Sequence, residues 1–200
     1  MGGDTCGKTL ILAGGLGTRL GHLTFRTPKP MMPIRGEPFL AYPMRHLGSL
    51  GLRKFILAVA FMPQKIRDHF GDGRDFGWEI EYSTEPYLMG TGGAVLYAQP
   101  MWGDRVLVVN GDTYTVEDWR KLIDFHGTHD KLITKAVIGG VHAGAHVVER
   151  EAFAEFSSGR NFSMERDLFP LVPYAVYPCE CGFADIGTPE RLEAFREAVC

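Results

Sequence analysis

The sequence has no surplus of positive charge and no long apolar run. Its 200 residues carry 21 Lys and Arg against 24 Asp and Glu, a formal net charge of -3. Because nucleic-acid-binding proteins usually present a basic surface, this balance argues against DNA or RNA as a partner. No apolar segment approaches the roughly 20 residues of a membrane-spanning helix, and the N-terminus lacks the charged start and apolar stretch of a secretory signal. We therefore expect a cytoplasmic protein without a membrane partner, and a homodimer remains open.

Cysteine is also scarce, and the four residues are Cys6, Cys179, Cys181 and Cys200. The pair at 179 and 181 has half of a metal-site pattern, but no second Cys or His pair follows at zinc spacing. We interpret this pair as one face of a strand. The seven His residues are scattered along the chain, and we expect His126 and His129 at the end of a helix.

Apolar and amphipathic segments alternate along the first two thirds of the chain. Strands are predicted at Thr9–Ala13, Lys54–Ala60, Glu79–Thr84 and Arg105–Val109. Helices are predicted at Pro38–Ser49, Gln64–Phe70, Thr91–Gln99 and Glu117–His126. This order indicates an α/β, Rossmann-like fold with a mainly parallel mixed sheet flanked by helices, in which ligands bind beyond the carboxyl ends of the strands. Since no repeat or linker interrupts the pattern, residues 1–200 are expected to form a single domain.

The last third of the chain is less regular. Leu132–Ile138 and Val141–Val148 are predicted to form an antiparallel pair of strands. A helix is expected at Glu149–Phe156 and a strand at Ala175–Glu180. Thr188, which precedes a proline and an acidic residue, is the expected N-cap of the last helix.

Two glycine-rich loops near the N-terminus compete as phosphate sites. Gly2–Thr9 (GGDTCGKT) matches the P-loop pattern, which would make Lys8 the phosphate ligand of an NTPase. A P-loop lies between a preceding strand and a following helix, whereas nothing precedes this segment and the next residues are themselves a strand. We therefore expect residues 1–8 to be a flexible tail. The P-loop NTPase stays open as an alternative that deletion of the tail would test.

The second loop, Gly14–Leu20 (GGLGTRL), directly follows a predicted strand. Glycines let the backbone approach a phosphate closely and adopt positive φ, and the Arg19 guanidinium matches phosphate oxygens. Farther along, Pro28 and Pro30 constrain the chain on both sides of Lys29, which suits this lysine to a phosphate. A dinucleotide fingerprint fits poorly, because the third glycine of that pattern is missing.

Together these motifs resemble the sugar-1-phosphate nucleotidyltransferase family, over nearly the whole chain. The G-G-x-G-T-R-L loop and the P-K-P motif of that family match Gly14–Leu20 and Pro28–Pro30. Within the family, a G-T-G-G-A loop and Phe162–Glu165 are most similar to the heptose-1-phosphate guanylyltransferases. The resemblance implies a GT-A-like fold. The remaining motif matches are Gly36–Leu40 (GEPFL), Gly90–Ala94 (GTGGA), Asn110–Asp112 (NGD) and Asp185–Pro189 (DIGTP).

The resemblance implies transfer of a nucleotidyl group from an NTP, expected to be GTP, to a sugar 1-phosphate, expected to be a heptose 1-phosphate. Asp112 and Asp185 are hard oxygen donors at strand ends and are the expected ligands of one Mg²⁺. Arg19, Lys29 and Asp112 are the expected catalytic residues. The expected nucleotide-binding residues are Leu12, Ala13, Gly14, Gly15, Gly17, Thr18, Arg19, Lys29, Glu85, Gly90, Thr91, Gly92, Asn110 and Gly111.

The chain departs from the family pattern on the side expected to bind the acceptor sugar. The segment near residues 131–145 is shorter than in the family, and no Glu-Lys-Pro motif occurs in the chain. His142 stands where the family usually has Asn, and His142, Gly144 and Glu165 are the candidate sugar-binding residues. Since the missing motif supplies the lysine that faces the sugar phosphate in the family, a nucleotide-binding module without transferase activity is the alternative function. The sequence fixes neither the base nor the sugar.

Overall fold

A central β-sheet organises the chain, and the computed structural model describes residues 6–199. Within this part of the chain seven strands lie in the order β10-β8-β9-β6-β1-β4-β5. Strand β9 is antiparallel to both of its neighbours, and the other pairs are parallel. The predicted mainly parallel mixed sheet is therefore confirmed. Its strands are β1 (Thr9–Leu12), β4 (Lys54–Val59), β5 (Glu79–Thr84), β6 (Arg105–Asn110), β8 (Ile133–Ile138), β9 (Val141–Glu149) and β10 (Tyr174–Pro178).

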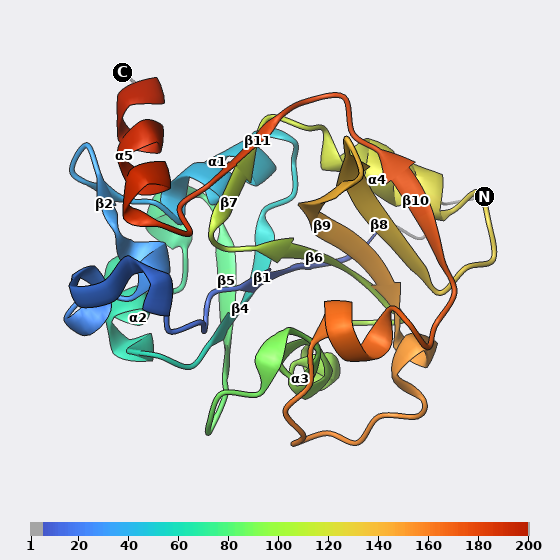
Figure 1. Cartoon of the computed structure of the whole chain (residues 1–200). Helices are drawn as coiled ribbons and strands as arrows, with labels where there is room; N and C mark the ends of the chain where they lie inside the picture. The colour runs from blue at the N-terminus through green and yellow to red at the C-terminus, as the bar shows by residue number, and fades with distance from the viewer. Residues whose placement is uncertain (1–5, 200) are drawn as a thin grey trace.

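Helices cover both faces of the sheet, because its central strands are nearly continuous in apolar residues and must be buried on both sides. Helices α1, α2 and α4 pack on one face, and α3 and the short helix η6 pack on the other (Figure 1). No helix in the described range is long and apolar enough to cross a membrane. The helices of the sheet layers are α1 (Ala41–Ser49), α2 (Pro63–Phe70), α3 (Gly90–Tyr97), α4 (Trp119–His126) and η6 (Met164–Leu168).

A third apolar cluster connects the loop after β1 to the last helix, α5 (Pro189–Ala198). Two short antiparallel pairs of strands accompany it, β2 (Pro33–Ile34) with β3 (Glu37–Pro38) and β7 (Thr113–Thr115) with β11 (Phe183–Asp185). The second pair places Asp185 opposite Thr113, and the N–H of Ile186 donates to the carbonyl of Asp112 at 3.1 Å. Asp112 directly precedes β7 and Asp185 ends β11, so the two candidate metal ligands lie at the same end of this strand pair.

Several element boundaries differ from the sequence prediction. The helix expected from Pro38 begins at Ala41, because Glu37–Pro38 instead pairs with Pro33–Ile34. The helix expected at 149–156 is a single short turn, since β9 continues to Glu149. Thr188 caps α5 as predicted, with its side chain accepting from the N–H of Arg191. The remaining short helices are η1 (Thr18–Phe25), η2 (Lys29–Met31), η3 (Arg74–Phe76), η4 (Gln99–Met101) and η5 (Arg150–Phe153).

The predicted flexible tail over residues 1–8 is wrong for its last three residues, while residues 1–5 lie outside the described part of the chain. Cys6 is buried, and burial raises the pKa of its thiol to about 12. The Lys8 ammonium forms an ion pair with Glu81 and donates to the carbonyl of Met101 at 3.0 Å. Because Lys8 precedes β1, it lies at the amino end of that parallel strand, away from the edge where ligands bind. These contacts argue against the P-loop alternative.

Candidate functional site

A cavity of about 450 Å³ lies beyond the carboxyl ends of β1, β5 and β6. Most of the predicted nucleotide-binding residues line it, although they come from five separate segments of the sequence. Arg19, Gly92, Gly111 and Asp185 are not among the lining residues. The predicted residues that do line the cavity are Leu12, Ala13, Gly14, Gly15, Gly17, Thr18, Lys29, Glu85, Gly90, Thr91, Asn110 and Asp112.

The loop after β1 packs closely on two charged side chains of the cavity wall. A Cβ at Gly14 would lie 2.8 Å from Glu85 Oε1 and 3.0 Å from the backbone nitrogen of Ala60. Gly17 has a φ of +63°, and a Cβ there would lie 2.9 Å from the Cβ of Lys29. Side chains at these two positions would push the loop off the wall, so glycine is required for the close approach. The loop thereby presents its backbone to the cavity.

Lys29 forms an ion pair with Asp112 at the cavity wall. The lysine side chain is 9% exposed and the aspartate side chain 35% exposed. Pro28 and Pro30 flank the lysine as predicted, and the turn closes with a 2.8 Å bond from the N–H of Met31 to the carbonyl of Pro28. The carboxylate of Asp112 holds the buried ammonium of Lys29 in place. The two groups can still separate, because an incoming anion can bind the lysine while a cation binds the aspartate.

The second candidate metal ligand, Asp185, is held by a cation from α5. Its carboxylate accepts from Arg191 Nη1 at 2.8 and 3.1 Å and from the N–H of Gly187 at 2.8 Å. The Arg19 guanidinium also reaches this end of β11, since a Cβ at Gly187 would lie 3.2 Å from Arg19 Nη2. Arg19 therefore lies beside Gly187 and Asp185 rather than in the cavity wall.

The donor chemistry at the end of β7 and β11 fits a hard divalent cation. Within residues 6–199 no cluster of three or more His, Cys, Asp or Glu side chains is arranged to hold a metal. Asp112, directly before β7, and Asp185, the last residue of β11, are each paired with a basic side chain. Mg²⁺ commonly takes one or two carboxylates and completes its shell with water and substrate phosphates. The pair therefore fits a cation that arrives with a phosphorylated ligand.

Glu85 closes the far wall of the cavity. Its Oε2 accepts from the N–H of Met89 at 2.9 Å, and the residue is 8% exposed. Burial raises the pKa of this carboxyl above its usual value, although the bond from Met89 opposes the shift. The loop that follows Glu85 is held from behind, because the N–H groups of Gly92 and Gly93 donate to the carbonyl of Phe162 at 3.0 and 3.2 Å. Gly92 thus supports the loop without lining the cavity.

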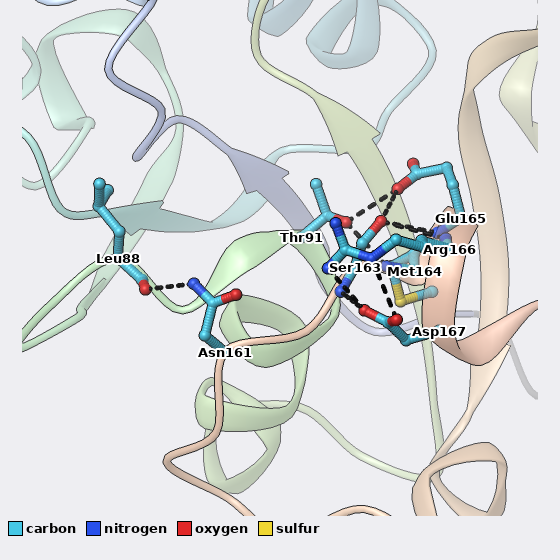
Figure 2. Close-up of polar contacts among 8 residues, drawn as sticks. All are labelled: Leu88, Thr91, Asn161, Ser163, Met164, Glu165, Arg166 and Asp167. Carbon is cyan, nitrogen blue, oxygen red and sulfur yellow. Dashed lines mark hydrogen bonds and ion pairs between the residues drawn. The ribbon is translucent and has the colours of Figure 1, made fainter.

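The three candidate sugar-binding residues occupy different environments. Gly144 has a φ of +80°, and a Cβ there would lie 3.0 Å from the side chain of Thr113 in a separate small cavity. His142 is half-buried, burial lowers the pKa of its imidazole, and its Nε2 lies 3.2 Å from the carbonyl of Ala145. Glu165 alone contacts a lining residue, because it accepts from Thr91 Oγ1 at 3.0 Å (Figure 2).

Sequence reasoning missed five residues of the cavity wall. Leu16 and Leu88 are large apolar side chains that are 39% and 40% exposed, and both face the cavity. Their exposure beside glycine-rich loops is a signal that could have found them, since flat apolar surfaces suit a ligand ring. The sequence around Asn161 carries no such signal, because Asn161 is bonded to the cavity wall through Leu88, which is 73 residues away in sequence. The missed residues are Leu16, Pro30, Leu88, Ala94 and Asn161.

A family model described as "Nucleotidyl transferase" matches residues 8–146, which include the glycine loop, Lys29, Glu85 and Asp112. The chain belongs to the nucleotidyl transferase family. It is 30% identical to the D-glycero-alpha-D-manno-heptose 1-phosphate guanylyltransferase of Campylobacter jejuni over 219 residues, covering 94% of this chain and 98% of that protein. The corresponding protein of Aneurinibacillus thermoaerophilus is 29% identical over 217 residues, with 92% and 94% covered.

Two further similarities extend the comparison. The mannose-1-phosphate guanylyltransferase of Mycobacterium tuberculosis is 31% identical over 220 residues, which cover 90% of this chain but only 61% of that protein. The crystal structure of HddC from Yersinia pseudotuberculosis complexed with GMP-PN superposes with a TM-score of 0.84 at 25% identity, covering 96% of this chain and 99% of HddC. The nucleotidyltransferase fold predicted from the motifs is therefore confirmed.

Proposed function

We propose that this nucleotidyltransferase transfers a guanylyl group from GTP to a heptose 1-phosphate, in a reaction that depends on Mg²⁺. The observation that carries the proposal is the single cavity that gathers the glycine loop, Lys29, Glu85, Thr91 and Asp112. The coarser activity, transfer of a nucleotidyl group to a sugar 1-phosphate, is shared by the named relatives in Campylobacter, Aneurinibacillus and Mycobacterium. The base and the sugar follow the two heptose 1-phosphate guanylyltransferases, whose alignments cover 94% and 92% of this chain and 98% and 94% of those proteins.

The chain contributes mainly position and charge to this reaction. An oxygen of the sugar phosphate forms a bond to the α-phosphorus of GTP, while the bond from that phosphorus to the bridging oxygen breaks and pyrophosphate leaves with the electron pair. The backbone of Gly14–Thr18 and the ammonium of Lys29 lie where they can hold the triphosphate. We propose that Arg19, which lies beside Gly187, contacts phosphate oxygens that extend toward the end of β11. No covalent intermediate with the protein is required.

Asp112 and Asp185 would hold the Mg²⁺, since Asp112 directly precedes β7 and Asp185 ends the neighbouring strand β11. When bound, the cation neutralises negative charge that develops on the phosphate oxygens. In the structure Lys29 forms an ion pair with Asp112, and Arg191 forms one with Asp185. We propose that binding of the triphosphate draws the basic groups toward phosphate and leaves the carboxylates to the cation.

The test is pyrophosphate release from GTP, UTP, dTTP and CTP against a panel of sugar 1-phosphates that includes heptose, mannose and glucose. The expected result is release with GTP and a heptose 1-phosphate, abolished by EDTA and restored by Mg²⁺. Release only with another nucleotide would overturn the base assignment but not the reaction type. A folded protein that gives no release with any pair would overturn the proposed function.

A second candidate function, nucleotide binding without transfer, is favoured by the acceptor side. Strands β8 and β9 are joined by a turn at Gly139-Gly140, and the alignments with the heptose relatives are longer than the 200 residues of this chain. The relatives therefore have residues without counterparts in this chain, and we propose that some of them belong to the segment near 131–145. Calorimetry that detects tight GTP binding, together with no turnover in the panel, would establish this alternative.

A further inference from the structure

Residues 159–163 clamp the loop that follows Glu85. The N–H of Phe162 donates to the carbonyl of Met89 at 2.9 Å, and the Tyr87 hydroxyl donates to the carbonyl of Gly159. Asn161 Nδ2 donates to the carbonyl of Leu88 at 2.7 Å (Figure 2). These bonds fix a segment from the last third of the chain against the wall of the cavity.

The bond to Leu88 determines the orientation of the Asn161 amide. A carbonyl oxygen can only accept, so the NH₂ group of the amide faces Leu88 and the amide oxygen faces away from it. Figure 2 shows the amide nitrogen directed at Leu88 and the oxygen on the other side of the group. Among the described residues no hydrogen bond to Asn161 Oδ1 is formed, and Asn161 and Leu88 both line the cavity. A ligand that reaches Asn161 from the cavity would therefore find an oriented amide oxygen that accepts no hydrogen bond from the described residues.

Glu85 supplies a second acceptor on the same wall. Its Oε2 is engaged by the N–H of Met89, and its Oε1 lies over Gly14. A carboxylate and an amide oxygen together favour a base edge that carries adjacent donors. Guanine presents N1–H and the 2-amino group side by side. Uracil and thymine present one ring N–H between two carbonyls, and cytosine and adenine present one amino group beside a ring acceptor.

We infer that Asn161 selects the base, through its Oδ1 accepting a hydrogen bond from the 2-amino group of guanine, while Glu85 takes N1–H. This inference rests on the proposed function, since it assumes that the nucleotide occupies the cavity. The exposed side chains of Leu16 and Leu88 provide apolar surface for the faces of the purine. Asn161 is a binding residue in this scheme, and it takes no part in the transfer of the nucleotidyl group.

The experiment compares GTP with ITP, which lacks only the 2-amino group, in wild type and Asn161→Ala. Wild type is expected to prefer GTP in kcat/KM by about tenfold, as one lost hydrogen bond predicts. In Asn161→Ala the GTP value should fall about fivefold to tenfold, and the ITP value should change less than twofold. Tyr87→Phe is the matched control, because it removes a neighbouring bond of the clamp without altering the cavity wall.

A purely structural role of Asn161 would lower the values for GTP and ITP equally, and that result would overturn the inference. Equal use of GTP and ITP by wild type, or a preference for a pyrimidine nucleotide, would also overturn it. If the protein turns over no nucleotide, the proposed function fails, and the inference is decided by calorimetric Kd values for GTP and ITP in the same three proteins. A loss of affinity confined to GTP in Asn161→Ala would support it, and the absence of GTP binding by wild type would exclude it.

Discussion

The loops after β1, β5 and β6 line the cavity with glycine backbone, Lys29 and Glu85, whereas β8 and β9 contribute no lining residue in the part of the chain that is described. On the first side, which we call the nucleotide side, the charged groups Lys29 and Glu85 line the cavity although both residues are buried. On the second, the acceptor side formed by β8, β9 and η6, His146 is 0% exposed and neither ring nitrogen has a hydrogen-bond partner among the described residues.

The difference indicates how each side tolerates change. The nucleotide side depends on backbone geometry, in which a single Cβ at Gly14 or Gly17 would collide with its neighbours. The acceptor side packs His146 against the ring of Phe169 at 5.6 Å and sets Lys135 Nζ 4.7 Å from the same ring. Such side-chain packing can be rearranged by insertion or deletion at the β8–β9 turn. We therefore expect the first side to tolerate fewer changes than the second.

The largest expected effect is the loss of turnover in Asp112→Asn, which tests the core of the nucleotide side. The substitution removes a proposed metal ligand and leaves the buried ammonium of Lys29 beside a neutral amide. We expect kcat to fall at least about 1,000-fold while the protein remains folded, measured by pyrophosphate release and thermal unfolding. Asp72→Asn, which removes an exposed ion pair with Arg74, is the control. Substantial activity in Asp112→Asn would remove this residue from the metal site.

The next effect compares two glycines of the same loop. Gly17→Ala places a Cβ at a φ of +63° and 2.9 Å from the Cβ of Lys29, whereas Gly15 has nothing within 4 Å of the corresponding position. We expect Gly17→Ala to lower the free energy of unfolding by about 1–3 kcal/mol, and Gly15→Ala by less than about 0.5 kcal/mol. Urea unfolding of both variants measures the difference. Equal destabilisation would show that the loop is not held by the contact at Gly17.

The contrast between the nucleotide side and the acceptor side also explains which features the sequence could predict. The parallel strands and their alternation with helices were predictable, because runs such as Val106–Val109 are apolar throughout and are bounded by polar residues. Lys29 and Asp112, 83 residues apart in sequence, were both predicted from local motifs, and the structure pairs them. The short pairs β2–β3 and β7–β11 were missed, since strands of two or three residues carry no periodicity.

Asn161 and the position of Arg19 could not be predicted for a different reason. Asn161 reaches the cavity because residues 159–163 fold back on the loop at 87–93, and only the tertiary structure creates that contact. Arg19 follows the predicted phosphate loop, yet the left-handed backbone at Gly17 and the helix η1 turn its guanidinium toward Gly187. Local motifs identify residue types, whereas the direction of a long side chain depends on neighbours distant in sequence.

A smaller effect is expected at the boundary between the two sides, where Glu165 accepts hydrogen bonds from Thr91 and Ser163. If Glu165 contacts the sugar, Glu165→Gln should raise KM for the sugar 1-phosphate by about tenfold and leave KM for GTP within about twofold. Steady-state kinetics with each substrate varied in turn measures both values. Equal increases in the two KM values would instead show that Glu165 acts on the nucleotide through Thr91.

The smallest effect is a pH dependence of stability that belongs to the acceptor side. Complete burial lowers the pKa of His146 well below 6.5, with His142 and Lys135 adding to the shift. Near pH 6.5 this histidine therefore binds a proton in the unfolded chain but not in the folded chain. The contribution of His146 to the free energy of unfolding is fully present above that pH and is lost as the pH falls. Between pH 6.5 and 5.5 the loss from one such residue is about 1 kcal/mol.

His146→Leu should remove this contribution. Between pH 6.5 and 5.5 the free energy of unfolding of wild type, measured by urea denaturation, should fall by about 1 kcal/mol more than that of the variant. His142 and His126, whose pKa values are also lowered by burial, would account for the slope that remains. At pH 8 the variant should be at least as stable as wild type, because leucine removes two buried ring nitrogens that lack partners. An unchanged slope would mean that the imidazole of His146 reaches solvent or a polar ligand, and the acceptor side would then be open to substrate rather than closed by packing.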